Sequence, residues 1–264
     1  MKNLSTMSLS QVQQIKYILT DIDDTLTSNG MLKSNAYASM EKLSNEGYII
    51  IPVTGRCAGW CDHIARMWPV GGVVSENGAF FFSYDHASKK MNNVYSQTAN
   101  EREKNFALLK QLKNKILNQV PGTAEASDQE YRITDLAIDF AEDVSKLPEN
   151  KINQIVQIAK QNGAIAKISS IHVNCWIGTH NKLSTSLNML KENFGLSDKE
   201  IQNKVVFIGD SPNDSTMFGF FENSVGVANV VDLVDSIEIL PKYLTSNFSG
   251  DGFVELANFI IDNK

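Results

Sequence analysis

Short apolar runs that end abruptly in polar turn residues recur along this chain. Residues 17–19, 48–53 and 204–209 each have the length of a buried strand. Amphipathic stretches of helical length separate them; the first is expected to start at Ser34, as its N-cap, and to end at Gly47. Strands that alternate with helices are joined by right-handed crossovers into a parallel sheet. The chain is therefore predicted to be an α/β protein.

The alternation changes character in the middle of the chain. Segments 80–82 and 93–95 resemble the arms of a β excursion, and they are followed by a long amphipathic helix. After it we expect strands at 136–140, 164–168 and 171–177, with a second helix at 149–161. This part of the sequence is interpreted as a separate α/β domain inserted into the first one. The expected division is residues 1–83 and 181–264 for the core and residues 84–180 for the insertion.

Composition excludes several classes of protein. The 264 residues are 42% hydrophobic, enough for a sizeable core. The net charge of −6 and the absence of a Lys/Arg cluster disfavour nucleic-acid binding. No run approaches the roughly 20 apolar residues of a membrane span, and the first residues lack the apolar stretch of a signal peptide. A soluble, cytoplasmic protein without a disulfide framework is expected, because three cysteines leave one unpaired.

Carboxylates follow two of the predicted strands directly. Asp21 and Asp23 come after the first strand, and Asp210 and Asp214 come after the strand at 204–209. A solvated acidic turn would explain the first pair alone. In a parallel sheet, however, the carboxyl ends of the strands share one edge, where ligands bind. The four carboxylates, together with Thr54 after the strand at 48–53, are thus expected to meet in one crevice.

Such a set of side chains suits a hard cation and a phosphate. Mg²⁺ prefers oxygen ligands, while backbone N–H groups in tight turns and at helix N-termini hold phosphate oxygens. The four histidines have no metal-binding spacing, and Cys57 and Cys61 continue a helical stripe that faces the core. Magnesium is therefore favoured over zinc.

Four segments in order, DIDDTL, VTGR, a helix that opens with Lys182, and GDSPND, resemble the motifs of the haloacid dehalogenase-like phosphatases. The position of the insertion is similar to the subclass with a large α/β cap between the second and third motifs. That subclass includes phosphatases of sugar phosphates, sucrose phosphate, trehalose phosphate and mannosylphosphoglycerate, and the eukaryotic-type phosphomannomutases. The resemblance covers nearly the whole chain and implies a Rossmann-like parallel-sheet core with an inserted α/β cap domain.

The resemblance also implies roles for the carboxylates. Asp21 would be the nucleophile that becomes an aspartyl-phosphate, and Asp23 the general acid and then the general base. Mg²⁺ would be bound by Asp21, the carbonyl of Asp23 and Asp210, with Asp214 supporting the waters of the metal. Asp24 stands where many members have glycine, and it receives no role.

The phosphoryl oxygens have their own expected partners. By resemblance, Thr54 and Lys182 would bind them, with Gly55 in the same turn and Asn213 orienting the fourth motif. Lys182 is followed by leucine rather than the commoner glycine, so Lys167 is kept as the alternative lysine.

The predicted strand at 171–177 alternates between polar and apolar side chains. His172, Asn174 and Trp176 share one face, which is expected to close over the substrate unless it is an ordinary solvated face. The other face is expected to pack on the cap helices; it carries Ile171, Val173, Cys175 and Ile177. Further candidates for contact with substrate are Arg56, Glu76, Asn77 and Arg132.

These features together predict a Mg²⁺-dependent phosphomonoester hydrolase. Its substrate would be a small phosphorylated metabolite, a sugar or sugar-acid phosphate. A phosphomutase of the same superfamily would use the same residues and is the enzymatic alternative. A phosphometabolite-sensing or interaction module is the non-enzymatic one, since a fold does not dictate a function.

Overall fold

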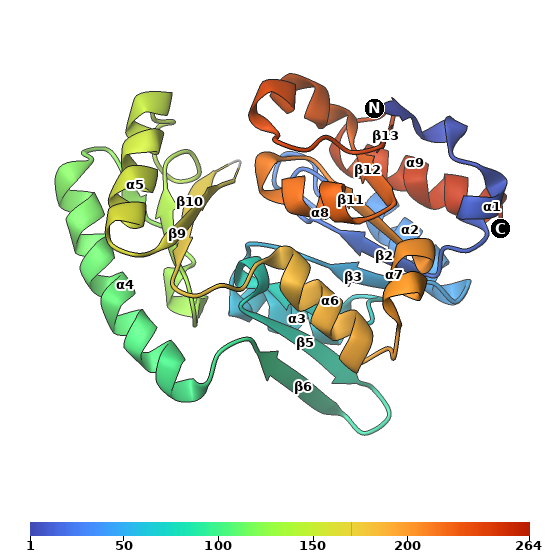
Figure 1. Cartoon of the computed structure of the whole chain (residues 1–264), viewed down its shortest axis with the longest axis horizontal. Coiled ribbons are helices and arrows are strands. Elements are labelled where there is room, and N and C mark those ends of the chain that lie inside the picture. The colour runs from blue at the N-terminus through green and yellow to red at the C-terminus, as the bar shows by residue number, and fades with distance from the viewer. Residues whose placement is uncertain (170) are drawn as a thin grey trace.

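A six-stranded parallel sheet organises the larger part of the molecule (Figure 1). The computed structural model describes residues 1–169 and 171–264. The strand order is β1-β13-β12-β11-β2-β3, and every neighbouring pair is parallel. The strands are β1 (Lys2–Asn3), β2 (Tyr17–Thr20), β3 (Ile49–Pro52), β11 (Val205–Gly209), β12 (Asn223–Gly226) and β13 (Tyr243–Leu244). The predicted α/β class with a parallel-sheet core is confirmed.

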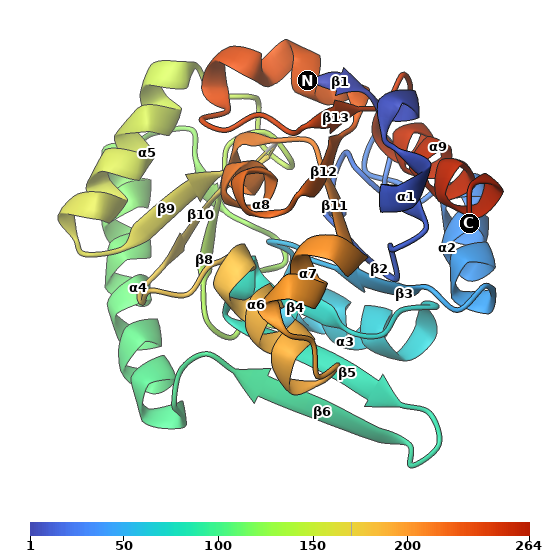
Figure 2. The same cartoon turned by 45° about the vertical axis from the view of Figure 1, so that its right-hand side comes forward.

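Helices cover both faces of this sheet, as Figure 2 shows. Consecutive strand residues point to opposite faces, so Ile18 packs with α2 and α9 whereas Leu19 packs with α6 and α8. This burial on both faces explains why β2, β3 and β11 are largely apolar in sequence. The helices are α1 (Leu9–Val12), α2 (Ser34–Asn45), α3 (Ala58–Met67), α6 (Lys182–Glu192), α7 (Asp198–Lys204), α8 (Ser215–Phe220) and α9 (Ser249–Asp262). Short 3₁₀ helices are η1 (Leu4–Thr6), η2 (Glu76–Gly78), η3 (Gln129–Tyr131), η4 (Pro212–Asp214) and η5 (Ala228–Ser236).

The predicted helix boundaries are accurate to a few residues. Helix α2 begins at Ser34, so its N-cap is Lys33 and not Ser34 as expected, and Gly47 follows the helix with a φ of 87°. Cys57 is the N-cap of α3, and both Cys57 and Cys61 are buried as the helical stripe predicted. Among the described residues, no helix is long and apolar enough to cross a membrane.

A β-hairpin continues the core beyond the expected domain boundary. Strands β4 (Val73–Ser75), β5 (Phe80–Asp85) and β6 (Lys90–Tyr95) form an antiparallel sheet, which a parallel bridge between Val53 and Val74 joins to the end of β3. The boundary expected between residues 83 and 84 falls inside β5. The side chains of Phe80 and Phe82 pack in the same apolar cluster as the parallel sheet. We therefore propose that the inserted domain begins after β6.

The insertion has its own sheet and its own apolar core. Its antiparallel sheet has the order β7-β8-β10-β9, and two helices pack on one face. All buried residues of this core lie between Leu109 and Cys175, and they include Val173 of β10. The elements are α4 (Ala99–Gln119), β7 (Ala124–Glu125), β8 (Leu136–Asp139), α5 (Glu149–Gln161), β9 (Ile165–Ile168) and β10 (His172–Trp176). We refer to this unit as the cap.

Candidate active site

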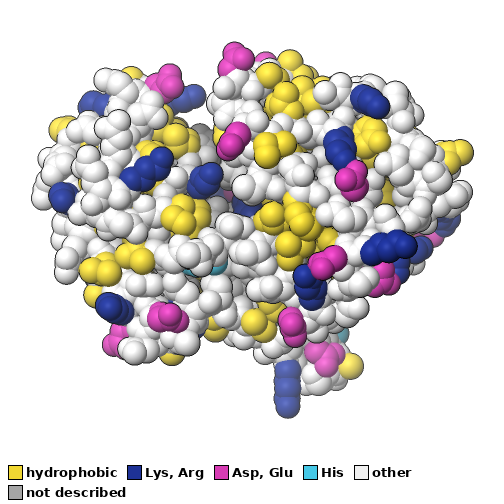
Figure 3. Space-filling view, in the orientation of Figure 1, with side chains coloured by type: hydrophobic (Ala, Val, Ile, Leu, Met, Phe, Trp, Pro, Cys, Tyr) yellow, Lys and Arg dark blue, Asp and Glu magenta, His cyan; other side chains and the backbone are white. Residues whose placement is uncertain are grey.

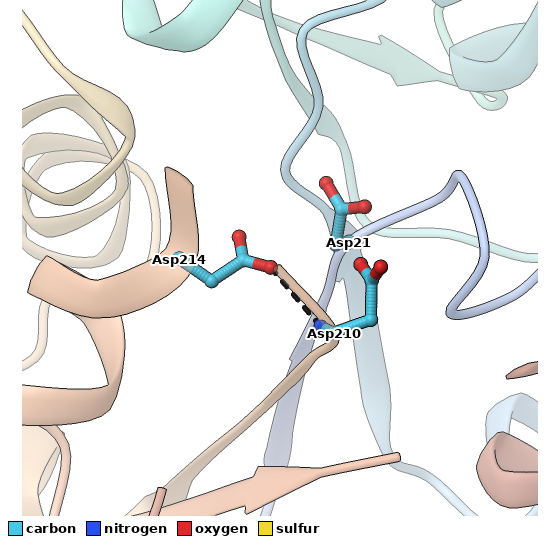
Figure 4. A group of neighbouring side chains, drawn as sticks. All are labelled: Asp21, Asp210 and Asp214. Atoms are coloured by element: carbon cyan, nitrogen blue, oxygen red, sulfur yellow. Dashed lines mark hydrogen bonds between the residues drawn. The ribbon is translucent and has the colours of Figure 1, made fainter. Parts of the chain in front are cut away.

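Three carboxylates converge at the carboxyl edge of the parallel sheet (Figure 4). Strands β2 and β11 are neighbours, with Thr20 paired to Ile208, so Asp21 and Asp210 leave the sheet side by side. Asp214 lies in η4 and turns back toward them; one of its oxygens accepts hydrogen bonds from the backbone N–H groups of Asp210 (3.1 Å) and Ser211 (3.3 Å). Carboxylate oxygens of the three aspartates lie within 4.8 Å of one another. Of the side chains expected to meet in one crevice, the structure brings Asp21, Asp210 and Asp214 into this cluster, whereas Asp23 and Thr54 lie outside it.

The donor set of this cluster fits a hard divalent cation. All three carboxylates are buried, and Asp210 Oδ1 accepts a hydrogen bond from Thr25 Oγ1 at 3.1 Å. Burial, with Asp214 and Asp23 nearby, raises the pKa of Asp21 to about 7, although Lys182 opposes the shift. Burial beside Asp21 also raises the pKa of Asp210. Buried like charges of this kind are relieved by a bound cation, and all the donors are oxygens.

Lys182 is the cation that the structure places in the cluster. Its ammonium group donates hydrogen bonds to Asp21 Oδ1 (2.7 Å), Asp214 Oδ1 (2.8 Å) and Asn213 Oδ1 (3.2 Å). The side chain is only 3% exposed; burial acts to lower its pKa, but the two carboxylates outweigh burial and raise it. Lys182 opens α6, and Asn181 caps the helix by accepting from the N–H of Ser184. It is Lys182, and not Lys167, that lies against Asp21.

Asp23 lies outside the cluster of three carboxylates and pairs with Arg56. The guanidinium group of Arg56 donates to both oxygens of Asp23, from Nε at 2.9 Å and from Nη2 at 2.9 Å. Arg56 Nη1 also donates to Glu142 of the cap at 3.3 Å. Nε2 of His172 lies 2.8 Å from the other oxygen of Glu142, although its N–H is not aligned for a hydrogen bond. The contact with His172, and the charge of Arg56, lower the pKa of Glu142 to about 2 against partial burial.

The turn after β3 connects the core to the cap. Thr54 is fully buried, and its Oγ1 accepts from the N–H of Arg56 at 3.0 Å. The carbonyl of Gly55 accepts from Arg132 Nη1 at 3.0 Å. A Cβ atom on Gly55 would lie 2.7 Å from Nδ2 of Asn174, so any other residue here would force the Asn174 side chain to move.

A cavity of about 20 Å³ lies between the carboxylates and the cap. It has room for roughly one water molecule. The predicted residues that line it are Asp21, Asp23, Gly55, Arg56, Arg132, His172, Asn174, Asp210 and Asn213, and they are joined by Ser169, Ile171 and Ser211. The prediction that Ile171 packs on the cap helices was wrong. Strand β10 begins only at His172, so the alternation does not extend back to Ile171.

Three of the residues predicted to contact substrate do not line this cavity: Glu76, Asn77 and Trp176. Glu76 is fully buried; its carboxylate accepts from the N–H groups of Ala58 (3.0 Å), Ile133 (3.0 Å) and Thr134 (2.7 Å). The carboxylate of Glu76 therefore links α3 to the cap through hydrogen bonds. Burial first, and Asp135 next, raise its pKa to about 7.

Asn77 and Trp176 line a second pocket instead. Arg132, which does reach the cavity, is held by two buried ion pairs with Asp128 (2.9 Å) and Asp135 (3.0 Å). It is therefore a fixed donor rather than a mobile surface charge.

Sequence reasoning missed Glu142 and Ser211. Ser211 lies inside the fourth motif, between Asp210 and Asp214, and a single serine there gives no separate sequence signal. Glu142 follows β8 in a turn that Asp139 organises by accepting from the N–H groups of Ala141 (2.9 Å) and Glu142 (2.8 Å). The aspartate at the end of this strand could have indicated the turn that carries Glu142, because aspartate side chains accept hydrogen bonds from the backbone of the turn that follows them.

The sequence matches the haloacid dehalogenase-like hydrolase family over residues 18–254. No curated protein matches it significantly. Among solved structures, a Thermoplasma acidophilum protein superposes with a TM-score of 0.71 at 16% identity, covering 94% of this chain and 98% of that one. A HAD/COF-like hydrolase of Plasmodium vivax gives 0.69 at 20% identity, covering 97% and 100%. The sucrose-phosphatase of Synechocystis gives 0.64 at 13% identity, covering 94% and 98%.

At these identities the structural likeness shows a shared fold. The family match spans both the carboxylate cluster and the cap. The chain belongs to the haloacid dehalogenase-like hydrolase family, as its four motifs predicted.

Proposed function

We propose that the protein is a Mg²⁺-dependent phosphomonoesterase acting on a small phosphorylated metabolite, a sugar or sugar-acid phosphate. The observation that carries the proposal is the contact of Lys182 with Asp21 at 2.7 Å, inside a cluster of buried carboxylates beneath the cap. A carboxylate can attack a phosphate dianion only where positive charge offsets their repulsion. The family and its sucrose-phosphatase relative support this reading.

The chemistry has two steps. An oxygen of Asp21 attacks phosphorus, the bond from phosphorus to the leaving-group oxygen breaks, and Asp23 gives that oxygen a proton. Asp23 then takes a proton from a water molecule whose oxygen attacks the aspartyl-phosphate, which releases inorganic phosphate and restores Asp21. Lys182 neutralises the negative charge of the phosphoryl oxygens. Thr54 and the turn at Gly55 donate hydrogen bonds to these oxygens, and Asn213 orients the fourth motif.

Asp21, Asp210 and the carbonyl of Asp23 would hold Mg²⁺, with Asp214 accepting from its waters. When bound, the ion supplies charge neutralisation at the transferring phosphoryl group. Arg56 is a positioning residue. Its two hydrogen bonds to Asp23 fix the orientation of the general acid.

A phosphate-release screen tests the proposal. Purified protein with Mg²⁺ is expected to release inorganic phosphate from one or more compounds among sugar phosphates, sugar-acid phosphates, phosphoglycolate, nucleotides and cofactor phosphates. Single turnovers are analysed for both phosphate and substrate isomers. Isomer without phosphate would indicate a mutase, and binding without either product would indicate a sensing module.

Mg²⁺ is expected to raise the melting temperature of the protein. The buried carboxylates of Asp21 and Asp210 repel each other when no metal ion is bound, so a metal ion that binds only the folded state stabilises it by mass action. Titration with millimolar Mg²⁺ in a thermal melt measures the shift. The variant Asp210→Asn should lose most of it; an equal shift in the variant and in the wild type would remove Asp210 from the metal site.

A further inference from the structure

A second, larger pocket opens next to the catalytic cluster. Its volume is about 230 Å³, compared with about 20 Å³ for the cavity above Asp21. Asn213 lines both spaces, and Lys182 reaches the wall of the second one. On this side of the molecule the surface is hollowed between the lobe that carries α4 and α5 and the elements α6 and α8, with basic side chains at its rim (Figure 3). We call this space the lysine-side pocket, after Lys167 and Lys182.

His180 lines this pocket with two ring nitrogens that have no hydrogen-bond partner among the described residues. Its side chain is only 6% exposed. Buried polar atoms are nearly always satisfied, so two orphaned nitrogens that border a cavity indicate a ligand. Burial lowers the pKa of His180 to about 4, which keeps the ring neutral at physiological pH. A neutral imidazole offers one donor and one acceptor, the pair that a hydroxyl group uses.

Two further residues extend the same wall. The ring of Trp176 stacks on that of His180 with centroids 5.9 Å apart, and its Nε1 donates to the carbonyl of His180 at 3.1 Å. The indole is thereby fixed as a flat apolar surface beside the pocket. Nδ2 of Asn77, also buried, lacks a partner as well. An aromatic face with unsatisfied donors and acceptors around it is suited to a polyhydroxylated chain or ring.

Lys167 supplies a positive charge to the pocket. It is exposed on the edge strand β9 and makes no ion pair with any described residue. Lys167 pairs with Asn174 in the antiparallel ladder, so the two side chains share one face of the cap sheet. Asn174 lines the small cavity and Trp176, two residues further along β10, lines the large one, a step of about 7 Å. That face therefore leads from the reaction centre to Lys167.

We propose that the lysine-side pocket binds the leaving group and selects phosphorylated sugar acids, with Lys167 pairing the distal carboxylate and His180 binding hydroxyl groups. The inference rests on the proposed phosphatase function and narrows its substrate class. The neighbouring pocket, at about 230 Å³, offers more room for an organic group than the small cavity, at about 20 Å³. An exposed ammonium group at its rim favours an anion over a neutral sugar.

Matched substrate pairs test the role of Lys167. We expect the wild type to prefer 6-phosphogluconate over glucose 6-phosphate and 3-phosphoglycerate over glycerol 3-phosphate in kcat/KM. In Lys167→Met the acid-to-neutral ratio should fall about fivefold, the scale of a partly exposed ion pair. Lys160→Met, which removes an exposed lysine from α5, is the control and should keep the wild-type ratio.

The outcomes separate the inference from the function beneath it. If the ratio of kcat/KM for the acidic over the neutral substrate is the same in the wild type and in Lys167→Met, the inference is overturned. Release of phosphate by the wild type would still support the phosphatase function. If the wild type releases phosphate from no compound, the proposed function fails and the inference fails with it.

His180 gives an independent measurement. His180→Phe retains a ring that stacks on Trp176 but removes both orphaned nitrogens, so the melting temperature should rise while KM for 6-phosphogluconate increases about tenfold. His86→Phe, at an exposed position, is the control and should change neither quantity. A lower melting temperature with an unchanged KM would mean that His180 is only structural, and would overturn its place in the subsite.

Discussion

Asp21→Asn is expected to abolish phosphate release, with kcat lower by at least about 10⁴-fold, the scale seen when a nucleophile is removed. The amide keeps the shape of the side chain but is a very weak nucleophile toward phosphorus. Release of phosphate from p-nitrophenyl phosphate with Mg²⁺ measures the effect. Asp262→Asn, an exposed position at the end of α9, is the matched control and should retain full activity. Turnover at the wild-type rate in Asp21→Asn would exclude Asp21 as the nucleophile.

The same variant should remain folded and should lose a pH dependence. Burial raises the pKa of Asp21 from 3.8 to about 7 in the folded protein, so the folded state holds this proton more tightly than the unfolded state does. The corresponding stability is fully present below pH 3.8 and is lost as pH rises toward about 7. In chelator, the melting temperature of the wild type should fall more steeply over this range than that of Asp21→Asn.

Lys182→Met is expected to remove both activity and stability. The ammonium group is the buried partner of Asp21 and Asp214, and its loss leaves both carboxylates without their cation. Breaking a buried ion pair on one side costs about 3–5 kcal/mol of unfolding free energy. Urea unfolding in chelator measures this loss, and the phosphate-release assay measures the catalytic one. Lys191 lies on the same helix as Lys182, and Lys191→Met breaks only an exposed pair with Asp198 of α7, so it should change stability by less than about 1 kcal/mol.

A double variant distinguishes the two roles of Lys182. Lys182→Met combined with Asp214→Asn removes one of the stranded carboxylates, so part of the lost stability should return. Activity should not return, because the phosphoryl group still lacks its cation. Recovery of activity in the double variant would assign Lys182 a purely structural role.

Much of the core was predictable because local patterns agree with its tertiary structure. The strands β2, β3 and β11 are buried on both faces, so each is largely apolar and is recognisable as a short apolar run. The rule that parallel strands share a carboxyl edge then placed Asp21 beside Asp210, although 189 positions separate them in the sequence. Their catalytic roles stay predictions, which the experiments above address.

The cap was harder to predict because its important contacts are not local. The strand pattern of β10 correctly identified Val173 and Cys175 as core residues. It failed at Ile171, where the strand has not yet begun, and it did not separate the small cavity at Asn174 from the larger pocket at Trp176. The boundary expected at residue 84 followed the change in the alternation of strands and helices, but β5 continues through it because its phenylalanines pack in the core.

The sequence by itself determined the parallel α/β core, the family, and the meeting of Asp21, Asp210 and Asp214 at the edge of the sheet. These follow from period and from order along the chain, which are local properties. Only the tertiary structure decided that Lys182 rather than Lys167 contacts Asp21, that Glu76 ties the cap to α3, and that Glu142 and His180 border the site. Each of these depends on which side chains two separate sheets bring together, and no periodicity within either segment specifies that distance.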